Sequence, residues 1–407
     1  MYNALSTAEI LLPRAGIDLT KWAVVACDQF TAQPEYWQKA EAIAAGAPSA
    51  LRLVLPEVWL GEGDARIPAI RRAMADYLDS GTLVPAVKDG FVLVERATTA
   101  GIRPGLIAAL DLDQYDFGVG SRSLIRATEG TVLERVPPRA RIRAGAPVEL
   151  PHVMMLIDDP GDTVIGPLMA RREALRPLYD FDLMLGGGHL RGWAVEGSDA
   201  RGVFGAIDAL NARADGLLYA VGDGNHSLAA AKQCWLDLQK TLTPQERENH
   251  PARYALVELV TLACPALRFE PIHRALFGVD PAALMAEYRA YLAGVGADAG
   301  EGDDLVALDG AGREWHFRSD EHPLRRLQAF LDGWLARHPG ASIDYIQGEA
   351  ALRALVNRPD ALGLMPRAFD KAELFGYIRR YGVLPRKTFS MGEATDKRYY
   401  MEARRIL

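Results

Sequence analysis

The chain has 407 residues, of which 49% are hydrophobic, 24% are charged and 8% are aromatic. This composition is that of an ordinary globular protein and excludes collagen-like, mucin-like, coiled-coil and intrinsically disordered chains. The 46 basic and 53 acidic residues leave a formal net charge of −7, which argues against a general nucleic-acid-binding or anionic-membrane-binding protein. At about 150 residues per domain, this length predicts two or three domains or one large elaborated domain.

Redox and targeting features predict a cytoplasmic protein. The three cysteines, Cys27, Cys234 and Cys264, are too few and too widely spaced for a disulfide framework or a Cys-rich zinc site. The N-terminal sequence lacks the basic and apolar regions of a signal peptide, and no stretch approaches the roughly 20 apolar residues that span a bilayer. We therefore expect a soluble protein without nucleic-acid or membrane partners. The sequence does not determine the oligomeric state.

The first part of the chain predicts alternating strands and helices. A strand over residues 22–27 is followed by the polar loop Asp28-Gln29-Phe30-Thr31 and by a helix over residues 34–44. Apolar side chains at helical spacing predict a second helix over residues 65–78. Residues 91–97 and 105–113 have the composition of strands. This order of elements indicates an α/β or α+β fold.

The next part of the chain is rich in arginine. Residues 122–143 carry six arginines around a Thr-Glu-Gly turn. One interpretation is a solvated basic surface; the other is a surface that faces anions, because guanidinium groups bind phosphate oxygens in bidentate fashion. A strand over residues 153–157 and a long helix over residues 167–178 follow. Three glycines at 186–188 then predict a hairpin turn rather than a phosphate cradle, because the residues after them have a strand pattern.

A change in composition suggests how the chain is divided. Residues 287–341 are less hydrophobic and contain Gly/Asp turns between short apolar runs, which predicts a small inserted subdomain with a hairpin. From residue 342 the apolar pattern recovers. We therefore expect a main α+β domain over residues 1–286, a small subdomain over residues 287–341, and a C-terminal segment over residues 342–407 that packs back on the main domain.

Residues 217–240 contain the clearest functional signal. An apolar strand leads through the turn Gly222-Asp223-Gly224-Asn225-His226 into an Ala-rich helix. Asp223, Asn225 or Ser227 can cap this helix, and the N–H groups of its first turn attract anions together with the partial positive charge there. His226 adds a donor or a group that exchanges a proton near neutral pH. The alternative is a plain strand-to-helix turn with a locally hydrogen-bonded histidine.

This segment resembles the DGHHR-type motif of a bacterial and archaeal family, the domain of unknown function numbered one-zero-one-five. Further blocks are similar to that family and together cover nearly the whole chain: WAVVACDQFTAQPEYW, SLIRATEGTVLERVPPR, ELPHVMMLIDDP, YALVELVTLACPALRFEPIHRAL, IDYIQG and LPRKTFSMGEATDKRYYMEARRI. The sequence is therefore identified as a member of this family, which itself names no reaction.

The family motif in turn resembles the phosphate-binding motif of the ParB and sulfiredoxin superfamily. That resemblance implies an α+β fold with a ParB/sulfiredoxin-like core, large insertions and a small additional subdomain. Members of the superfamily bind nucleotides and include free serine kinases. Asp223, Gly224 and His226 match the motif, and the resemblance implies that this turn cradles phosphates.

The sequence departs from that motif at two positions. Asn225 replaces a histidine, and Ser227 replaces the arginine that clamps the phosphate. Either another cation takes the role of that arginine, or the site has changed its ligand. The candidates are Arg126, Arg135, Arg274 and Lys397.

Phosphoryl transfer to a hydroxyl also needs a carboxylate that orients or deprotonates the acceptor, while Mg²⁺ and basic groups balance the charge on the phosphates. Asp28, Glu129 and Asp223 are the candidate carboxylates, and His226 is a further candidate for proton transfer. Asp28 opens a polar loop after a strand, where a helix-start turn is the equal alternative. Glu129 lies among arginines, so a structural ion pair explains its position equally well.

The favoured function is a Mg²⁺-dependent kinase that uses ATP or ADP and acts on a small hydroxylated metabolite such as an amino acid. One alternative is a non-catalytic, nucleotide-gated regulatory protein. The other is a metal-dependent hydrolase with a His/Asp site drawn from His152, His226, His273, Asp158 and Asp159. No metal-ligand spacing supports a dedicated metal site, and no nucleophile motif of the GxSxG type is present.

Overall fold

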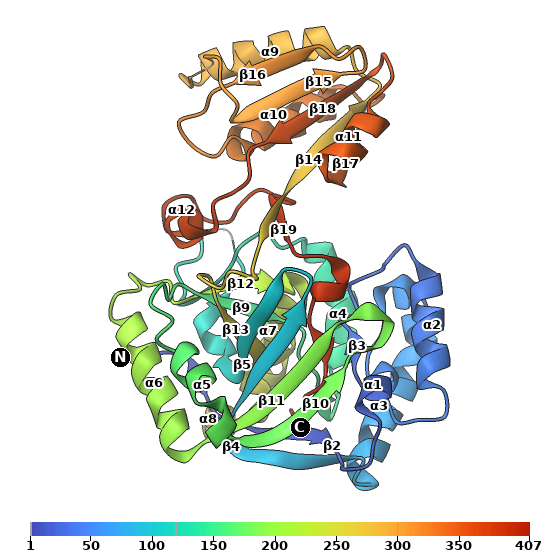
Figure 1. Cartoon of the computed structure of the whole chain (residues 1–407), viewed down its shortest axis with the longest axis vertical. Helices are drawn as coiled ribbons and strands as arrows, with labels where there is room; N and C mark the ends of the chain where they lie inside the picture. The colour runs from blue at the N-terminus through green and yellow to red at the C-terminus, as the bar shows by residue number, and fades with distance from the viewer. Residues whose placement is uncertain (1, 119, 299) are drawn as a thin grey trace. The chain divides into compact units, whose positions relative to one another are not determined.

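The computed structural model describes residues 2–118, 120–298 and 300–407 (Figure 1). The chain forms two compact units, one made of Met1–Leu267 with Gly392–Leu407 and the other of Arg268–Met391. The last residues of the chain thus belong to the first unit, and residues 287–341 lie within the second unit. None of the helices in the described residues is both long enough and apolar enough to cross a membrane.

A large mixed sheet forms the centre of the first unit. Its strands follow the order β10-β11-β4-β5-β13-β9-β12-β7-β6, with β1 paired to β5 and β2 paired to β4. Most neighbours are antiparallel, but β12 is parallel to β7, β13 to β9 and β6 to β7. The strands are β1 (Leu5–Ser6), β2 (Ala8–Pro13), β4 (Leu83–Thr98), β5 (Gly101–Asp111), β6 (Tyr115–Asp116), β7 (Ile125–Ala127), β9 (Met154–Ile157), β10 (Arg176–Asp182), β11 (His189–Glu196), β12 (Tyr219–Asp223) and β13 (Tyr254–Thr261).

Helices cover both faces of this sheet. Successive residues of a strand point to opposite faces, and here both faces carry buried apolar side chains. Val92 and Val94 of β4 pack into a cluster with α2 and α3, whereas Phe91 and Leu93 pack into a second cluster with α6 and α7. The helices of the unit are α1 (Leu19–Trp22), α2 (Pro34–Ala44), α3 (Gly63–Asp79), α4 (Val136–Arg143), α5 (Gly166–Ala170), α6 (Gly197–Asn211), α7 (Asn225–Leu238) and α8 (Pro244–Asn249).

The C-terminal segment adds two small strand pairs to the first unit. β3 (Val24–Val25) pairs with β20 (Tyr399–Tyr400), and β8 (Val148–Glu149) pairs with β21 (Arg404–Arg405). Short 3-10 helices connect the elements of this unit: η1 (Ala50–Arg52), η2 (Glu57–Glu62), η3 (Leu112–Gln114), η4 (Leu133–Arg135), η5 (Arg172–Ala174), η6 (Met184–Gly186), η7 (Gln239–Thr241), η8 (Pro251–Arg253) and η10 (Ala394–Asp396).

Most elements expected in the first unit are present, including α2, α3 and the antiparallel hairpin of β10 and β11 around the three glycines. The helix expected over residues 167–178 is wrong, because α5 ends at Ala170 and β10 begins at Arg176. Pairing with β11 overrides the local pattern there. Tyr179 lies opposite Gly192 in the hairpin, and the ring of Tyr179 occupies the space that a Cβ at Gly192 would need.

The second unit is a separate antiparallel sheet with the strand order β16-β15-β18-β14-β17, to which β19 adds beside β14. Helices α9 and α10 pack on one face of this sheet, and α11 packs on the other. The hairpin expected between residues 287 and 341 is β15 and β16. The elements are β14 (Phe269–Phe277), α9 (Pro281–Gly294), β15 (Leu305–Asp309), β16 (Glu314–Phe317), α10 (Leu324–Arg337), β17 (Ser342–Gln347), α11 (Glu349–Leu355), β18 (Ala361–Pro366), η9 (Lys371–Glu373), α12 (Leu374–Tyr381) and β19 (Phe389–Met391).

The fold class is therefore mixed α/β, with one large mixed sheet and one separate antiparallel sheet. The order of strands places β12 and its neighbours β9 and β7 side by side in the first unit. The expected ParB/sulfiredoxin-like core stays a prediction.

Candidate functional site

The strand-turn-helix expected over residues 217–240 is present. β12 ends at Asp223, Gly224 adopts a left-handed conformation with φ of 81°, and α7 begins at Asn225. A Cβ at Gly224 would lie 3.1 Å from Cα of Val153 and 3.4 Å from Cδ2 of His152. Both the backbone angle and the close packing therefore require glycine at this position.

No side chain caps α7 at its N-cap residue, Gly224, which corrects the expectation that a polar residue of the turn would do so. The carboxylate of Asp223 instead accepts a hydrogen bond of 2.9 Å from the N–H of Gly224. Asn225, the first residue of α7, has a buried Oδ1 with no hydrogen-bond partner among the described residues. A buried acceptor without a partner is unfavourable, so this atom is suited to a ligand that donates or coordinates.

Lys397 meets this turn from the far end of the chain. Its Nζ lies 3.2 Å from Oδ2 of Asp223, and the residue is buried. Lys397 follows η10 in the C-terminal segment, which belongs to the first unit. The structure therefore brings together two of the residues that the sequence proposed for phosphate binding, one from the turn and one from the C-terminal segment.

Asp28 belongs to the same cluster. Burial raises the pKa of Asp28. The charges of His152 and Lys397 lower it, and so does the Gln29 amide, which donates to the Asp28 carboxylate at 3.0 Å. The net result is a pKa below the ordinary value. The Asp28 carboxylate therefore stays ionised beside Lys397 and His152. Such a group can orient a hydroxyl or accept its proton.

A chain of hydrogen bonds runs beside the first turn of α7. Oγ of Ser227 lies 2.8 Å from Nε2 of His152, and Nδ1 of the same ring lies 2.7 Å from the hydroxyl of Tyr400. That hydroxyl also accepts a hydrogen bond of 3.3 Å from the N–H of Cys27. Burial, with Cys27 and Asp28 nearby, raises the pKa of Tyr400, so the hydroxyl stays protonated. Both ring nitrogens of His152 are thus held in place.

Sequence reasoning named His152 only as a metal-ligand candidate and did not name Tyr400. The described residues contain no group of three or more His, Cys, Asp and Glu side chains placed to bind a metal ion. The signal that could have found His152 is its position, since it precedes β9, the antiparallel neighbour of β12 in the sheet. Tyr400 lies three residues after Lys397, in a segment without a recognisable motif.

The loop that follows β7 lies along the other side of the turn. Ala127 of β7 is opposite Val221 of β12, and the hydroxyl of Thr128 donates to the carbonyl of Val221 at 2.7 Å. The N–H of Val132 lies 3.3 Å from Nε2 of His226. Glu129 is partly exposed in this loop. The loop that carries Glu129 therefore lies next to the start of α7.

The three candidate arginines are placed differently. The Arg126 guanidinium donates to the carbonyls of Ser123 at 2.8 Å and Gly216 at 2.9 Å, near the start of β12 rather than its end. Arg135 is exposed in η4. Arg274 belongs to β14 of the second unit, where its guanidinium donates to the carbonyl of Arg386 at 3.1 Å and lies over the ring of Tyr345.

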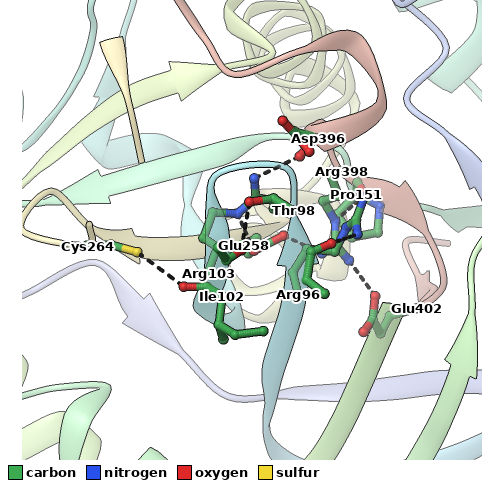
Figure 2. Close-up of polar contacts among 12 residues, drawn as sticks. Arg96, Thr98, Ile102, Arg103, Pro151, Glu258, Cys264, Asp396, Arg398 and Glu402 are labelled. Carbon is green, nitrogen blue, oxygen red and sulfur yellow. Dashed lines mark hydrogen bonds and ion pairs between the residues drawn. The ribbon is translucent and has the colours of Figure 1, made fainter. Parts of the chain in front are cut away.

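A buried ionic network fixes the C-terminal segment against the sheet. Arg398 lies between Glu258 of β13 and Glu402 (Figure 2), and its Nη1 donates to the Glu258 carboxylate at 2.7 Å. Nε of Arg398 also donates to the carbonyl of Pro151 at 2.7 Å. Because Arg398 follows Lys397 and Pro151 precedes His152, this network holds both site residues in position.

Two arginines from the hairpin of β4 and β5 fix the preceding part of the segment. Arg96 and Arg103 are direct cross-strand partners, and they donate to the carbonyls of Thr395 and Asp396, each at 2.8 Å. Burial and the neighbouring charge of Arg103 lower the pKa of Arg96 to about 10, which leaves it protonated at neutral pH. These contacts tether η10, which leads directly into Lys397.

A cavity of about 140 Å³ opens beside the hydrogen-bonded chain. Cys27, His152, Ser227 and Tyr400 line its polar end, and most of the remaining wall is aliphatic. Burial and the Asp28 charge raise the pKa of the Cys27 thiol, so this sulfur is not an activated nucleophile. The site therefore combines a charged cluster of Asp28, Asp223 and Lys397 with an adjoining apolar cavity.

The sequence matches a family model described as "Protein of unknown function (DUF1015)" over residues 11–337. This match spans most of the chain, and the protein belongs to that family. No curated protein matches the chain at a significant level.

Several solved structures are distantly similar. A free serine kinase mutant in complex with ADP shares 11% identity at a TM-score of 0.40, and the alignment covers 72% of this chain and 91% of that chain. The same kinase mutant in complex with AMP gives 11% identity, a TM-score of 0.41 and 72% and 90% coverage. Truncated SbnI from Staphylococcus aureus gives 10% identity, a TM-score of 0.37 and 70% and 82% coverage. Similarity at this level does not assign a function to the chain.

Proposed function

We propose that this protein binds the phosphates of ATP or ADP at the start of α7 and transfers a phosphoryl group to the hydroxyl of a small metabolite. The observation that carries the proposal is the ion pair between Lys397 and Asp223 at that helix start, together with the effect of the Lys397 charge on Asp28. The three residues come from distant parts of the chain. Phosphoryl transfer needs a cation for the phosphates and a carboxylate for the acceptor, and this cluster contains both.

The start of α7 and Lys397 supply the phosphate-binding part. The helix start carries a partial positive charge, and Gly224 supplies the left-handed backbone conformation with which the chain enters α7. Lys397 adds a point charge of the kind that binds phosphates in nucleotide sites. In this proposal Lys397 takes the role of the arginine that Ser227 replaces, and a bound phosphate competes with Asp223 for its ammonium group.

The oxygen atoms at the site are of the kind that Mg²⁺ binds. Mg²⁺ prefers carboxylate and amide oxygens, and in nucleotide sites one or two protein carboxylates suffice because the phosphates and water provide the other ligands. Asp28, Asp223 and the unpartnered Oδ1 of Asn225 are such oxygens. These residues would hold the ion, which neutralises charge on the phosphates. Asn225, which stands where the motif has a histidine, adds an amide oxygen that an imidazole ring lacks.

Asp28 is the carboxylate proposed to act on the acceptor. Its lowered pKa keeps it ionised at neutral pH, so it can orient the acceptor hydroxyl and take up its proton. His152 lies beside Asp28, and its ring is fixed by Ser227 and Tyr400, which stabilises the geometry of this pair. Glu129 and His226, on the opposite side of the turn, are second candidates for the same role.

The test compares two lysine variants of the full-length protein. Lys397→Met removes the cation at the start of α7. Lys240→Met removes a lysine at the other end of that helix, where Lys240 forms an exposed pair with Asp237 at 2.6 Å. Nucleotide with Mg²⁺ at 100 times its Kd should stabilise the wild type by about 2.7 kcal/mol in a thermal-shift assay. We expect Lys397→Met to lose this stabilisation and Lys240→Met to retain it.

Catalysis is tested with Asp28→Asn, which keeps the size of the side chain and removes its charge. We expect this variant to bind nucleotide and to lose phosphoryl transfer to a panel of hydroxylated metabolites, measured as release of ADP from ATP or of AMP from ADP and as product by mass spectrometry. A wild type that is not stabilised by any nucleotide contradicts the proposal. Nucleotide binding without transfer to any acceptor indicates the non-catalytic regulatory protein instead.

A further inference from the structure

The cavity beside the site has walls that indicate which acceptor it holds. Its aliphatic wall includes Leu53, Leu55, Met74, Ile142, Ala230 and Ala231. The last two belong to the same face of α7 as Ser227, so the cavity begins where the proposed phosphate site ends. A group that enters the cavity therefore extends away from the phosphates and along α7.

The charged side chains of the wall all have partners. Arg139 pairs with Glu57, and Arg143 pairs with Glu149. Glu149 also binds Arg404 at 2.6 Å and accepts the N–H of Leu256 at 2.9 Å. Burial raises the pKa of Glu149, but the two arginines lower it by more, so it stays ionised and paired. The wall thus offers no uncommitted charge, and a charged ligand group would lose its hydration there without compensation.

The polar end of the cavity suits a hydroxyl group. Ser227 and His152 each carry atoms that can donate or accept a hydrogen bond, and they lie 2.8 Å apart. His152 also lies beside Asp28, the proposed base. A hydroxyl at this end can therefore form a hydrogen bond with Ser227 or His152, next to the histidine whose charge acts on Asp28.

The volume of the cavity sets the size of the rest of the ligand. Its volume of about 140 Å³ is close to the roughly 150 Å³ of an apolar cavity that binds benzene in another protein. A benzene ring or a branched alkyl group of similar size therefore fills it.

We propose that the acceptor is an alcohol with an uncharged apolar body of this size, which lies in the cavity with its hydroxyl at Ser227 and His152. The reaction in this inference rests on the proposed function, whereas the class of ligand is inferred from the cavity alone. In the transfer, the acceptor oxygen forms a bond to the γ-phosphorus, the bond to the β-phosphate oxygen breaks, and the hydroxyl proton passes to Asp28. The site thereby disfavours free amino acids, whose two charged groups have no partners in this wall.

The test measures binding first and transfer second. Benzyl alcohol, 3-methylbutan-1-ol and L-serine are titrated into the full-length protein, with and without ATP and Mg²⁺, by calorimetry and ligand-observed NMR. We expect both alcohols to bind, and L-serine to bind at least about tenfold more weakly. A difference of one methylene group in an apolar pocket already changes affinity by about this factor. Tighter binding of L-serine than of both alcohols overturns the proposal.

Two variants locate the ligand. Ala230→Leu fills the cavity and should abolish alcohol binding while the nucleotide still binds, and Ala206→Leu on α6, outside the cavity lining, should change neither. If Ala230→Leu does not fold, Met74→Ala enlarges the cavity, and the preference should shift to larger alcohols. Loss of ATP binding in Ala230→Leu, with tripolyphosphate binding retained, would mean that the nucleobase occupies the cavity, and would overturn the proposal. Alcohol binding without transfer retains the ligand class but removes the proposed reaction.

Discussion

Replacing Arg398 by methionine tests the network that holds the site together. Arg398 is buried between the carboxylates of Glu258 and Glu402, and each residue exposes less than a tenth of its surface. Methionine fills much of the same volume but leaves both carboxylates without this cation. Breaking a buried ion pair from one side costs about 3–5 kcal/mol, because the remaining charge stays buried without compensation. We therefore expect a loss of stability of about this size in the first unit.

The assay is differential scanning calorimetry of the full-length protein. For a folding unit of this size, 1 kcal/mol corresponds to about 2–4 °C, so the transition of the first unit should fall by roughly 10 °C. Arg405→Met is the matched control, because Arg405 is an exposed neighbour whose nearest carboxylate, on Glu9, is 3.8 Å away. We expect the control to change stability by less than about 0.5 kcal/mol.

The loss in Arg398→Met should also depend on pH. In the wild type, burial raises the pKa of Glu258 but Arg103 and Arg398 lower it by more, so its folded pKa is depressed. A depressed pKa gives stability that is present above the unfolded value of about 4.3 and is lost as the pH falls through the folded value. Without Arg398, protonation of Glu258 costs less in the folded state. The deficit should therefore be smaller near pH 3.5, below the unfolded value, than near pH 7, and an equal deficit at both would refute this reasoning.

Three further outcomes are expected. Gly224→Ala should cost about 1–2 kcal/mol for the left-handed backbone alone, with an added cost from contact with Val153, and should weaken nucleotide binding; an unchanged melting temperature would contradict this. Lys397→Met should raise the pKa of Asp28, because burial then acts with less opposition, and carbon-detected NMR titration of the Asp28 carboxyl measures this; an unchanged pKa would place Lys397 elsewhere. Burial lowers the pKa of His189, but hydrogen bonds to two aspartates raise it by more. The raised folded pKa contributes stability that is present below about pH 6.5 and is lost as the pH rises through the folded pKa. His189→Gln should remove this pH-dependent part, at most about 1 kcal/mol because the ring is partly exposed, and a stability profile that matches the wild type would exclude it.

The strand-turn-helix at residues 217–240 was predicted well because local interactions decide it. An apolar run, a glycine in a left-handed conformation and an Ala-rich segment each favour one backbone conformation within a few residues. The same holds for α2 and for the glycine turn between β10 and β11. In contrast, residues 176–182 pair with β11, and this long-range pairing was stronger than the helical spacing of their apolar side chains.

The amino-acid sequence by itself determined the turn, its glycine, and the identity of Asp28, Asp223 and Lys397 as candidates, because those features depend on residue type and near neighbours. Only the tertiary structure decided that Lys397 pairs with Asp223, that the charges of Lys397 and His152 act on Asp28, and that Tyr400 binds His152. These interactions depend on the order of strands in the sheet and on the return of the C-terminal segment. The buried charges of Arg398, Glu258 and Glu402 fix that segment, and they act between residues that no local sequence pattern connects.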